Sequence, residues 1–225
     1  MDILENARTC LDYGNVNEAV LSEFTLSAVQ SGITLMGGGI GSGKSSTTES
    51  FLQRLEKTHT FKTESIIYIS AFELKDDDYR HVASGISDIA NDLIKRSASS
   101  SLFVVIDEIN SLDALNAAIA LAEAGHSVLA LVRTPRRAGL GAVLASAVSY
   151  VDVSEREDVA KRLIQLTNLF IEQPSHFSQT DGQPEYRYMS CPTGLKDALI
   201  NNLDEYGLDY ICKDILDAAI DYKGY

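Results

Sequence analysis

The sequence predicts an α/β fold, in which a mainly parallel β-sheet carries helices on both faces. Three observations lead to this prediction. Short apolar runs alternate with amphipathic stretches over most of the chain, which is typical of consecutive strand–helix–strand units. Residues 102–106 (LFVVI) are uniformly apolar, as expected for a strand that is buried on both faces. A glycine-rich stretch at 37–43 joins the first apolar run to a segment with helical spacing.

Turn residues and changes of hydrophobic period delimit the expected elements in chain order. Each apolar run of strand length is followed by a stretch whose apolar residues have helical spacing. Residues 1–30 also show this spacing and are predicted to form an N-terminal helical segment. Strands are expected at 32–36, 65–71, 102–106, 127–132 and 149–153, and helices at 44–56, 79–95, 112–124 and 140–147.

The last third of the chain has a different pattern. A helix is predicted at 158–169, and the stretch 174–184 after it is polar and rich in turn residues. Residues 186–190 are expected to pair back across this stretch as a hairpin. Two closing helices are expected at 193–203 and 210–222. The predicted division is a helical segment at 1–30, a core at 31–155, and a hairpin and helical subdomain at 156–225.

The composition excludes several classes of protein. The chain has 225 residues, of which 19 are basic and 32 acidic, so the net charge is −13. Because such a protein repels phosphate backbones, we expect no direct binding to nucleic acid. No run of about 18 apolar residues occurs, and we expect no direct membrane insertion. The N-terminus lacks a signal-peptide pattern, and Cys10, Cys191 and Cys212 lack metal-ligand spacing, which favours a cytoplasmic protein with reduced thiols.

Residues 38–45 (GGIGSGKS) match the phosphate-binding loop pattern in full. Glycines allow successive backbone N–H groups to surround a phosphate chain, and the start of the following helix faces the same anion. Lys44 is expected to reach the β- and γ-phosphates of ATP, and the Ser45 hydroxyl to bind Mg²⁺. The alternative is a flexible glycine turn without a ligand. The predicted nucleotide-binding residues are Gly38, Gly39, Ile40, Gly41, Ser42, Gly43, Lys44, Ser45 and Ser46.

Two adjacent carboxylates, Asp107 and Glu108, follow the buried strand at 102–106. Open α/β sheets bind their ligands at the carboxyl ends of the strands, so this pair is expected near the phosphate loop. Asp107 would hold Mg²⁺, and Glu108 would activate the attacking water as the catalytic residue. The alternative is that one of them caps the helix that starts near Ser111. A small-molecule kinase could use the same strand end.

Residues 122–134 (AEAGHSVLALVRT) resemble the segment after the Walker B strand in secretion ATPases. This superfamily contains the motors of type II secretion, type IV pilus assembly and retraction, and conjugative transfer. The resemblance implies a RecA-like P-loop NTPase core with a small C-terminal hairpin and helical tail, in a compact form without the family's N-terminal domain. Further similarity lies at 32–36, 45–48, 169–173 and 186–200.

Several positions depart from the family pattern. Arg133 stands where the family has the second histidine of its His box. Residues 70–71 (SA) replace the expected acidic box, with Glu73 or Asp76 as substitutes if the run is not a solvated turn. Asn110 lies near the position of a family arginine. Whatever the second histidine senses in the family must be done differently here or not at all.

Four residues are predicted sensors of nucleotide or contacts to a neighbouring subunit: His126, Arg133, Arg136 and Arg137. The arginines would supply positive charge as the transition state develops. The alternatives are a structural histidine at a helix–strand corner and an exposed basic loop.

The resemblance implies a motor that binds ATP and Mg²⁺ and hydrolyses ATP to drive a type IV pilus, type II secretion or conjugative-transfer machine. It also implies a homo-oligomer, such as a hexamer, or a ring shared with a related ATPase. The ring would act on a membrane-embedded pilus or secretion platform protein, which would bring this cytoplasmic protein to the inner membrane. Two alternatives stay open: a nucleotide-binding regulator or inactive paralogue within a ring of complete motors, and another RecA- or AAA-type ATPase. The chain has no arginine after Arg187, which counts against the AAA type.

Overall fold

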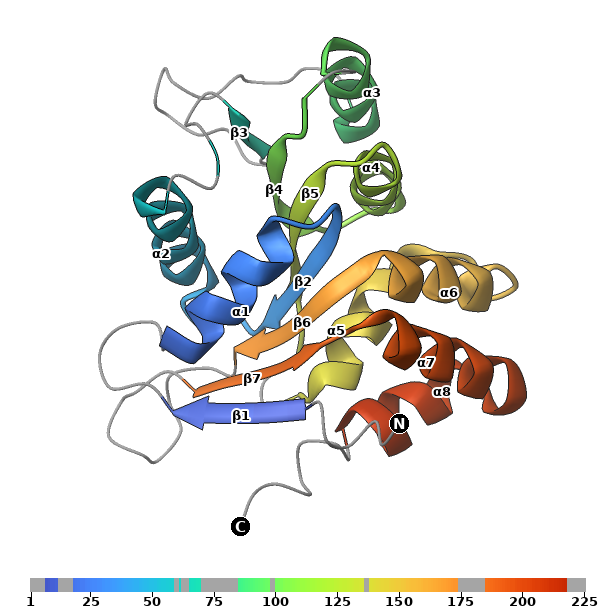
Figure 1. The fold of residues 1–225 in the computed structure, drawn as a ribbon. Helices are drawn as coiled ribbons and strands as arrows, with labels where there is room; N and C mark the ends of the chain where they lie inside the picture. The colour runs from blue at the N-terminus through green and yellow to red at the C-terminus, as the bar shows by residue number, and fades with distance from the viewer. Residues whose placement is uncertain are drawn as a thin grey trace.

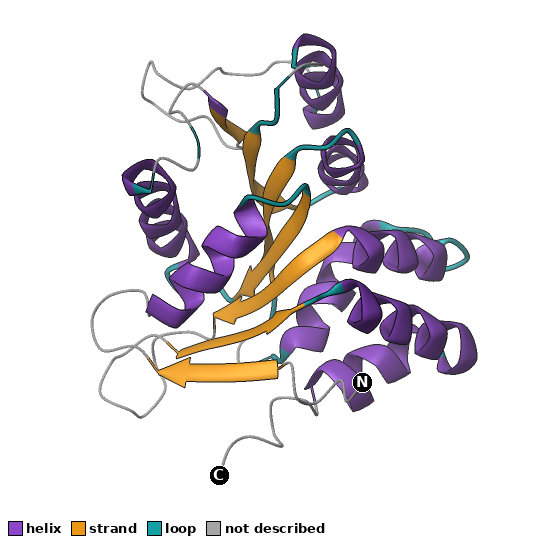
Figure 2. Cartoon of the chain, viewed as in Figure 1, coloured by secondary structure: helices purple, strands orange, loops and turns teal. Residues whose placement is uncertain are grey.

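The structure, a computed structural model, describes residues 7–11, 18–58, 61, 65–69, 85–97, 100–135, 138–173 and 185–217. These residues form a seven-stranded sheet with helices on both faces (Figure 1, Figure 2). The predicted fold class is confirmed. The strands are β1 (Ala7–Leu11), β2 (Gly32–Gly38), β3 (Ile66–Ile69), β4 (Phe103–Ile109), β5 (Ser127–Arg133), β6 (Thr167–Gln173) and β7 (Glu185–Ser190). The helices are α1 (Glu18–Ala28), α2 (Lys44–Lys57), α3 (Ile86–Arg96), α4 (Leu112–Glu123), α5 (Leu140–Ala147), α6 (Arg156–Leu166), α7 (Thr193–Tyr206) and α8 (Leu208–Tyr210), with a 3₁₀ turn η3 (Val148–Tyr150) and a π-helix η4 (Ile211–Asp217).

The strand order is β1-β7-β6-β2-β5-β4-β3. The five strands from β6 to β3 are parallel to one another, whereas β7 is antiparallel to β6, and β1 is antiparallel to β7. Strand β2 lies between β6 and β5, and β5 separates β2 from β4. The carboxyl ends of β2, β4, β5 and β6 therefore lie at the same end of the sheet, where parallel α/β sheets bind ligands.

The two faces of the sheet bury separate apolar clusters, because side chains alternate along each strand. On β4, Val104 and Ile106 belong to the cluster that contains the buried residues of α4, α5 and α6. Phe103 and Val105 belong to the cluster that contains those of α1 and α2. Figure 1 shows the same division, with α1 and α2 on one side of the sheet and α4, α6 and α7 on the other.

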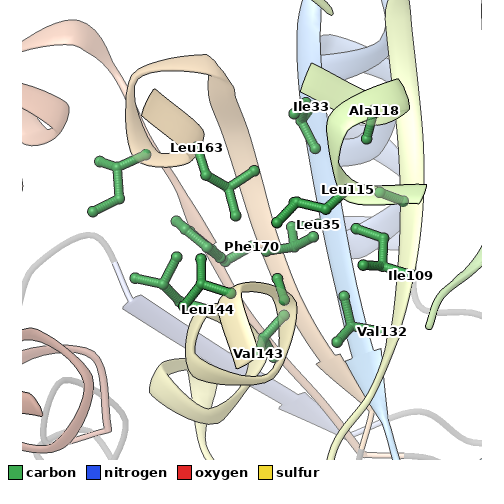
Figure 3. Packing of buried hydrophobic residues seen from close by; sticks show 14 of the residues in the cluster. Ile33, Leu35, Ile109, Leu115, Ala118, Val132, Val143, Leu144, Leu163 and Phe170 are labelled. Carbon is green, nitrogen blue, oxygen red and sulfur yellow. The ribbon is translucent and has the colours of Figure 1, made fainter. Parts of the chain in front are cut away.

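Figure 3 shows the first of these clusters at close range. Leu115 of α4, Val143 of α5 and Leu163 of α6 pack around Leu35 of β2 and Phe170 of β6 (Figure 3), and all five are fully buried. Burial of such a side chain contributes roughly 1.5–3 kcal/mol. This packing holds β2 and β6 side by side beneath the loop that follows β2.

The predicted fifth strand at 149–153 is wrong, because η3 occupies its start. Val148 and Val151 are buried, whereas Tyr150 and Val153 are 43% and 78% exposed. Burial at a spacing of three residues fits the 3₁₀ period and not the period of two of a strand. The fifth parallel strand is β6 instead, and its first three residues fall in the stretch that was predicted to be helical.

The other predicted core elements occur with shifted ends. Strands β2, β4 and β5 run past their predicted ends, so that Gly38, Asp107 and Arg133 are strand residues. The predicted hairpin is confirmed by the antiparallel pairing of β6 and β7. The second closing helix is formed by α8 and η4. Outside the described residues lie 70–71 with Glu73 and Asp76, the parts of predicted helices at 79–84 and 218–222, and the turn-rich stretch 174–184.

The N-terminal region contributes a strand as well as a helix. Strand β1 pairs with β7 at the edge of the sheet, and α1 follows it. The sheet thus includes strands from all three predicted segments of the chain, and the division into 1–30, 31–155 and 156–225 stays a prediction. Within the described ranges, none of the helices combines the length and apolar character needed to cross a bilayer.

Candidate nucleotide-binding site

The loop between β2 and α2 places a helix start above the end of a buried strand. Strand β2 is buried over its whole length, and α2 begins at Lys44. Gly41 and Gly43 have φ angles of +75° and +90°, which side-chain-bearing residues adopt only with strain. The N-cap residue of α2 is Gly43, which has no side chain to cap the helix. Helix N–H groups without a side-chain cap are available to an anion.

Lys44 lies across this loop. Its Nζ donates hydrogen bonds to the carbonyl oxygens of Gly38, at 2.6 Å, and Gly39, at 3.3 Å. Burial lowers the pKa of Lys44; the charge of Glu108 raises it and that of Arg133 lowers it. A partly desolvated ammonium that is held by carbonyl oxygens gains more from a phosphate than from these neutral partners.

The two carboxylates predicted from the sequence lie near the end of β4. Asp107 and Glu108 are both partly buried. Consecutive residues of a regular strand point to opposite faces of the sheet, yet both of these line one cavity. The pairing of β4 with β5 shifts its register between Ile106 and Ile109, at the position of the two acids. Such irregularities re-aim side chains at the ends of strands.

A cavity of about 390 Å³ connects the loop to the acidic strand end. Both carboxylates and Arg133 line this cavity, together with the predicted loop residues. Of those loop residues, only Gly38 does not line it. Leu131 of β5 also lines it. The full lining is Gly39, Ile40, Gly41, Ser42, Gly43, Lys44, Ser45, Ser46, Asp107, Glu108, Leu131 and Arg133.

Arg133, the last residue of β5, forms an ion pair with Glu108 across adjacent strand ends. The distance from Nη2 of Arg133 to Oε2 of Glu108 is 3.0 Å. The Arg133 side chain is 51% exposed and that of Glu108 is 15% exposed. The arginine that replaces the family histidine is therefore bound to the predicted catalytic carboxylate.

A buried hydrogen-bond network supports the loop from the β6 side, and the sequence did not predict it. The Gln173 amide donates to the Ser42 carbonyl oxygen at 2.7 Å and accepts from the Thr47 hydroxyl at 2.9 Å. Thr47 also shares a 2.8 Å hydrogen bond with the Tyr186 hydroxyl. The only signal in the sequence was the position of Gln173 at the end of an apolar run.

His126 does not lie at the loop. It precedes β5, at the opposite end of the sheet, and it is buried. Its Nδ1 accepts a hydrogen bond from the Leu102 N–H at 3.3 Å, and its Nε2 lies 3.0 Å from the Ser97 hydroxyl. Burial lowers the pKa of His126, which favours the neutral ring. Arg136 and Arg137 lie outside the described residues.

The donors predicted for Mg²⁺ fit that ion. Ser45 and Asp107 both line the cavity, and both offer oxygen ligands, which this hard cation prefers. A hydroxyl from the loop and a carboxylate from a nearby strand end are the donors that P-loop NTPases use for it.

Comparisons with solved structures identify the fold. The sheet order and the glycine-rich loop define a P-loop NTPase fold, and the solved structures named below share it. The ATPase DotB of Legionella pneumophila matches with a TM-score of 0.63 and 17% identity, over 92% of this chain and 64% of that one. The pilus retraction motor PilT, solved with bound ADP, matches with a TM-score of 0.62 and 19% identity, over 94% and 61%.

The VirB11 ATPase of the Brucella suis type IV secretion system, solved with sulphate, matches with a TM-score of 0.57 and 12% identity, over 80% of this chain and 54% of that one. The chain has the fold of the secretion ATPases, as the resemblance in its sequence implied. It spans between half and two thirds of the length of these structures. No protein-family model and no curated protein matches the sequence.

Proposed function

We propose that the protein is an ATP-binding and ATP-hydrolysing motor subunit of a type IV pilus, type II secretion or conjugative-transfer machine. The observation that carries this proposal is the cavity that joins the phosphate loop to Asp107, Glu108 and Arg133. The fold shared with DotB, PilT and VirB11 supports the class of machine.

The loop and the start of α2 bind the phosphates of ATP through backbone N–H groups. Lys44 exchanges its bonds to the carbonyl oxygens of Gly38 and Gly39 for bonds to the β- and γ-phosphates. Ser45 and Asp107 hold Mg²⁺, which when bound neutralises charge on the phosphate oxygens. Gln173 keeps the loop in shape through the Ser42 carbonyl.

Glu108 serves as the general base. Its carboxylate orients a water molecule toward the γ-phosphorus and accepts a proton from it. The water oxygen bonds to phosphorus, and the bond from phosphorus to the bridging oxygen breaks. Its electron pair leaves with ADP. The proton passes from Glu108 to solvent, and ADP and phosphate are released.

The assembly and location are part of the same proposal. The protein acts in a ring, as a homo-oligomer or with a related ATPase, and in that ring Arg136 or Arg137 contacts the site of a neighbour. The ring docks on a membrane-embedded platform protein from the cytoplasmic side. Subunit rotation between nucleotide states transmits the force.

Steady-state hydrolysis of Mg²⁺-ATP over a wide range of protein concentrations tests this function. Wild type is compared with Lys44→Ala and Glu108→Gln. We expect turnover that rises with protein concentration and is lost in both variants. Tight ATP binding that depends on Lys44, without hydrolysis at any concentration, would overturn the autonomous motor.

A nucleotide-binding regulator is the second candidate. The observation that favours it is the engagement of Glu108 by an arginine that stands where the family has a histidine. A regulator would bind ATP through Lys44, remain inactive alone, and change the hydrolysis rate of a complete motor when mixed with it.

A further inference from the structure

The ion pair between Arg133 and Glu108 has unequal members. Glu108 is mostly buried, at 15% exposure, so its charge needs a partner. Arg133 is half exposed, at 51%, so its guanidinium can leave the pair and remain solvated.

The pair withholds the carboxylate from a water molecule. The bonded oxygen, Oε2, accepts a hydrogen bond from Nη2 of Arg133 at 3.0 Å, so this oxygen is occupied while the pair is intact. Arginine stays charged at every working pH, so deprotonation cannot release Glu108. Release requires another anion that takes the guanidinium.

A γ-phosphate is such an anion. Among the described residues, Lys44, Arg133, Asp107 and Glu108 are the charged side chains that line the cavity, and their charges cancel. A triphosphate adds negative charge between them, and guanidinium binds phosphate oxygens with two parallel hydrogen bonds. ADP lacks the group that would compete with Glu108.

We propose that Arg133 is a switch residue that pairs with Glu108 until a γ-phosphate takes its guanidinium, which frees the carboxylate to accept the proton of the attacking water. The inference rests on the proposed function of this site. Arg133 would then distinguish a bound triphosphate from a bound diphosphate. It would also link this distinction to the general base Glu108, on β4, which β5 separates from the strand that precedes the loop. After hydrolysis, release of phosphate returns Arg133 to Glu108.

Equilibrium binding of ADP and of an ATP analogue with a nitrogen bridge between the β- and γ-phosphates tests the proposal. The variants are Arg133→Gln and Arg133→Lys. Arg162→Gln is the matched control, because Arg162 is also half exposed and ion-paired, with Glu123, and does not line the cavity. We expect Arg133→Gln to weaken binding of the analogue on the order of tenfold and to change the affinity for ADP by no more than about twofold. Arg133→Lys should recover part of the loss, and Arg162→Gln should change neither.

A double-variant cycle tests the competition itself. Glu108→Gln should tighten binding of the analogue when Arg133 is present, because it frees the guanidinium. The tightening should be much smaller in the Arg133→Gln background. Equal tightening in both backgrounds would mean simple repulsion between carboxylate and phosphate, and would overturn the switch.

The failures of the two proposals are distinguishable. An unchanged ratio of analogue to ADP affinity in Arg133→Gln, with Lys44-dependent binding intact, overturns the switch alone. The proposed function and the switch are both overturned if the wild-type protein binds neither nucleotide. They are also both overturned if Lys44→Ala binds the nucleotides as tightly as wild type does. Thermal unfolding of each variant separates loss of binding from loss of fold.

Discussion

Two of the polar residues that the resemblance to secretion ATPases singled out lie at the two ends of β5. At the amino end, His126 is buried between Ser97 and Leu102 and has a hydrogen-bond partner for each ring nitrogen. At the carboxyl end, Arg133 is half exposed and shares a cavity with Glu108 and the phosphate loop. One strand of seven residues separates a buried, hydrogen-bonded histidine from a charged site beside the loop.

The difference teaches how to separate a structural polar residue from a functional one. Both nitrogens of the His126 ring have hydrogen-bond partners inside the protein, and burial lowers its pKa, so a structural role accounts for this residue. Arg133 is charged, and its partner is a carboxylate that a γ-phosphate can replace. We therefore expect substitutions at the amino end to change stability and substitutions at the carboxyl end to change nucleotide chemistry.

The largest expected effect is at the carboxyl end, in Glu108→Gln. Removal of the base should lower the hydrolysis rate by about 10²–10⁴-fold. Nucleotide binding should persist, because the loop and Lys44 are untouched. The rate and the affinity are measured on the same preparation. Hydrolysis at the wild-type rate would mean that another group activates water.

A smaller effect at the same end is expected from Gln173→Leu. The substitution removes the hydrogen bonds to the Ser42 carbonyl and the Thr47 hydroxyl, which hold the loop. Each such bond contributes about 1 kcal/mol, so we expect about tenfold weaker binding of ADP and of the analogue alike. Gln165→Leu, on the exposed face of α6, is the control. Retained affinity in Gln173→Leu would show that the loop holds its shape without β6.

At the amino end, His126→Phe should act on stability alone. It leaves the Leu102 N–H without its acceptor, which costs about 1–3 kcal/mol, whereas the Ser97 hydroxyl keeps its hydrogen bond to the Leu93 carbonyl oxygen. Denaturant unfolding measures this loss, and Ser101→Ala, at the exposed side of the same corner, should cost much less. The hydrolysis rate of folded His126→Phe should equal that of wild type. A lower rate would give His126 a role in catalysis.

The smallest expected effect is the contribution of His126 to the pH dependence of folding stability. Burial lowers the pKa of His126 in the folded protein below its ordinary value of 6.5. The stability that the neutral ring contributes is therefore present above about pH 6.5 and is lost as pH falls toward the lowered pKa. Unfolding measured between pH 7 and pH 5 should show this decline in wild type and less of it in His126→Phe. An equal loss of stability in wild type and His126→Phe would mean that other titratable groups cause the decline.

Much of the site was predictable because it is local in the chain. The loop at 38–45 encodes its own backbone shape through glycine, and the helix after it starts where the pattern predicts an anion site. Asp107 and Glu108 follow a strand whose apolar composition marks it as buried. The strand at 149–153 was wrong because a short stretch in which apolar and polar residues mix (SYVDV) fits a 3₁₀ turn as well as a strand. The true fifth strand, β6, continues directly from a helix, and no turn signal marks its start.

The sequence by itself determined the α/β class, the phosphate loop and the acidic strand end, since each depends on neighbouring residues and on the period of burial. Only the tertiary structure decided which strand ends meet. The strand order places Arg133 beside Glu108, Gln173 beneath Ser42, and His126 at the far end of the sheet. These pairings depend on how distant segments pack against two apolar clusters, and that packing sums many weak contacts that no local pattern records.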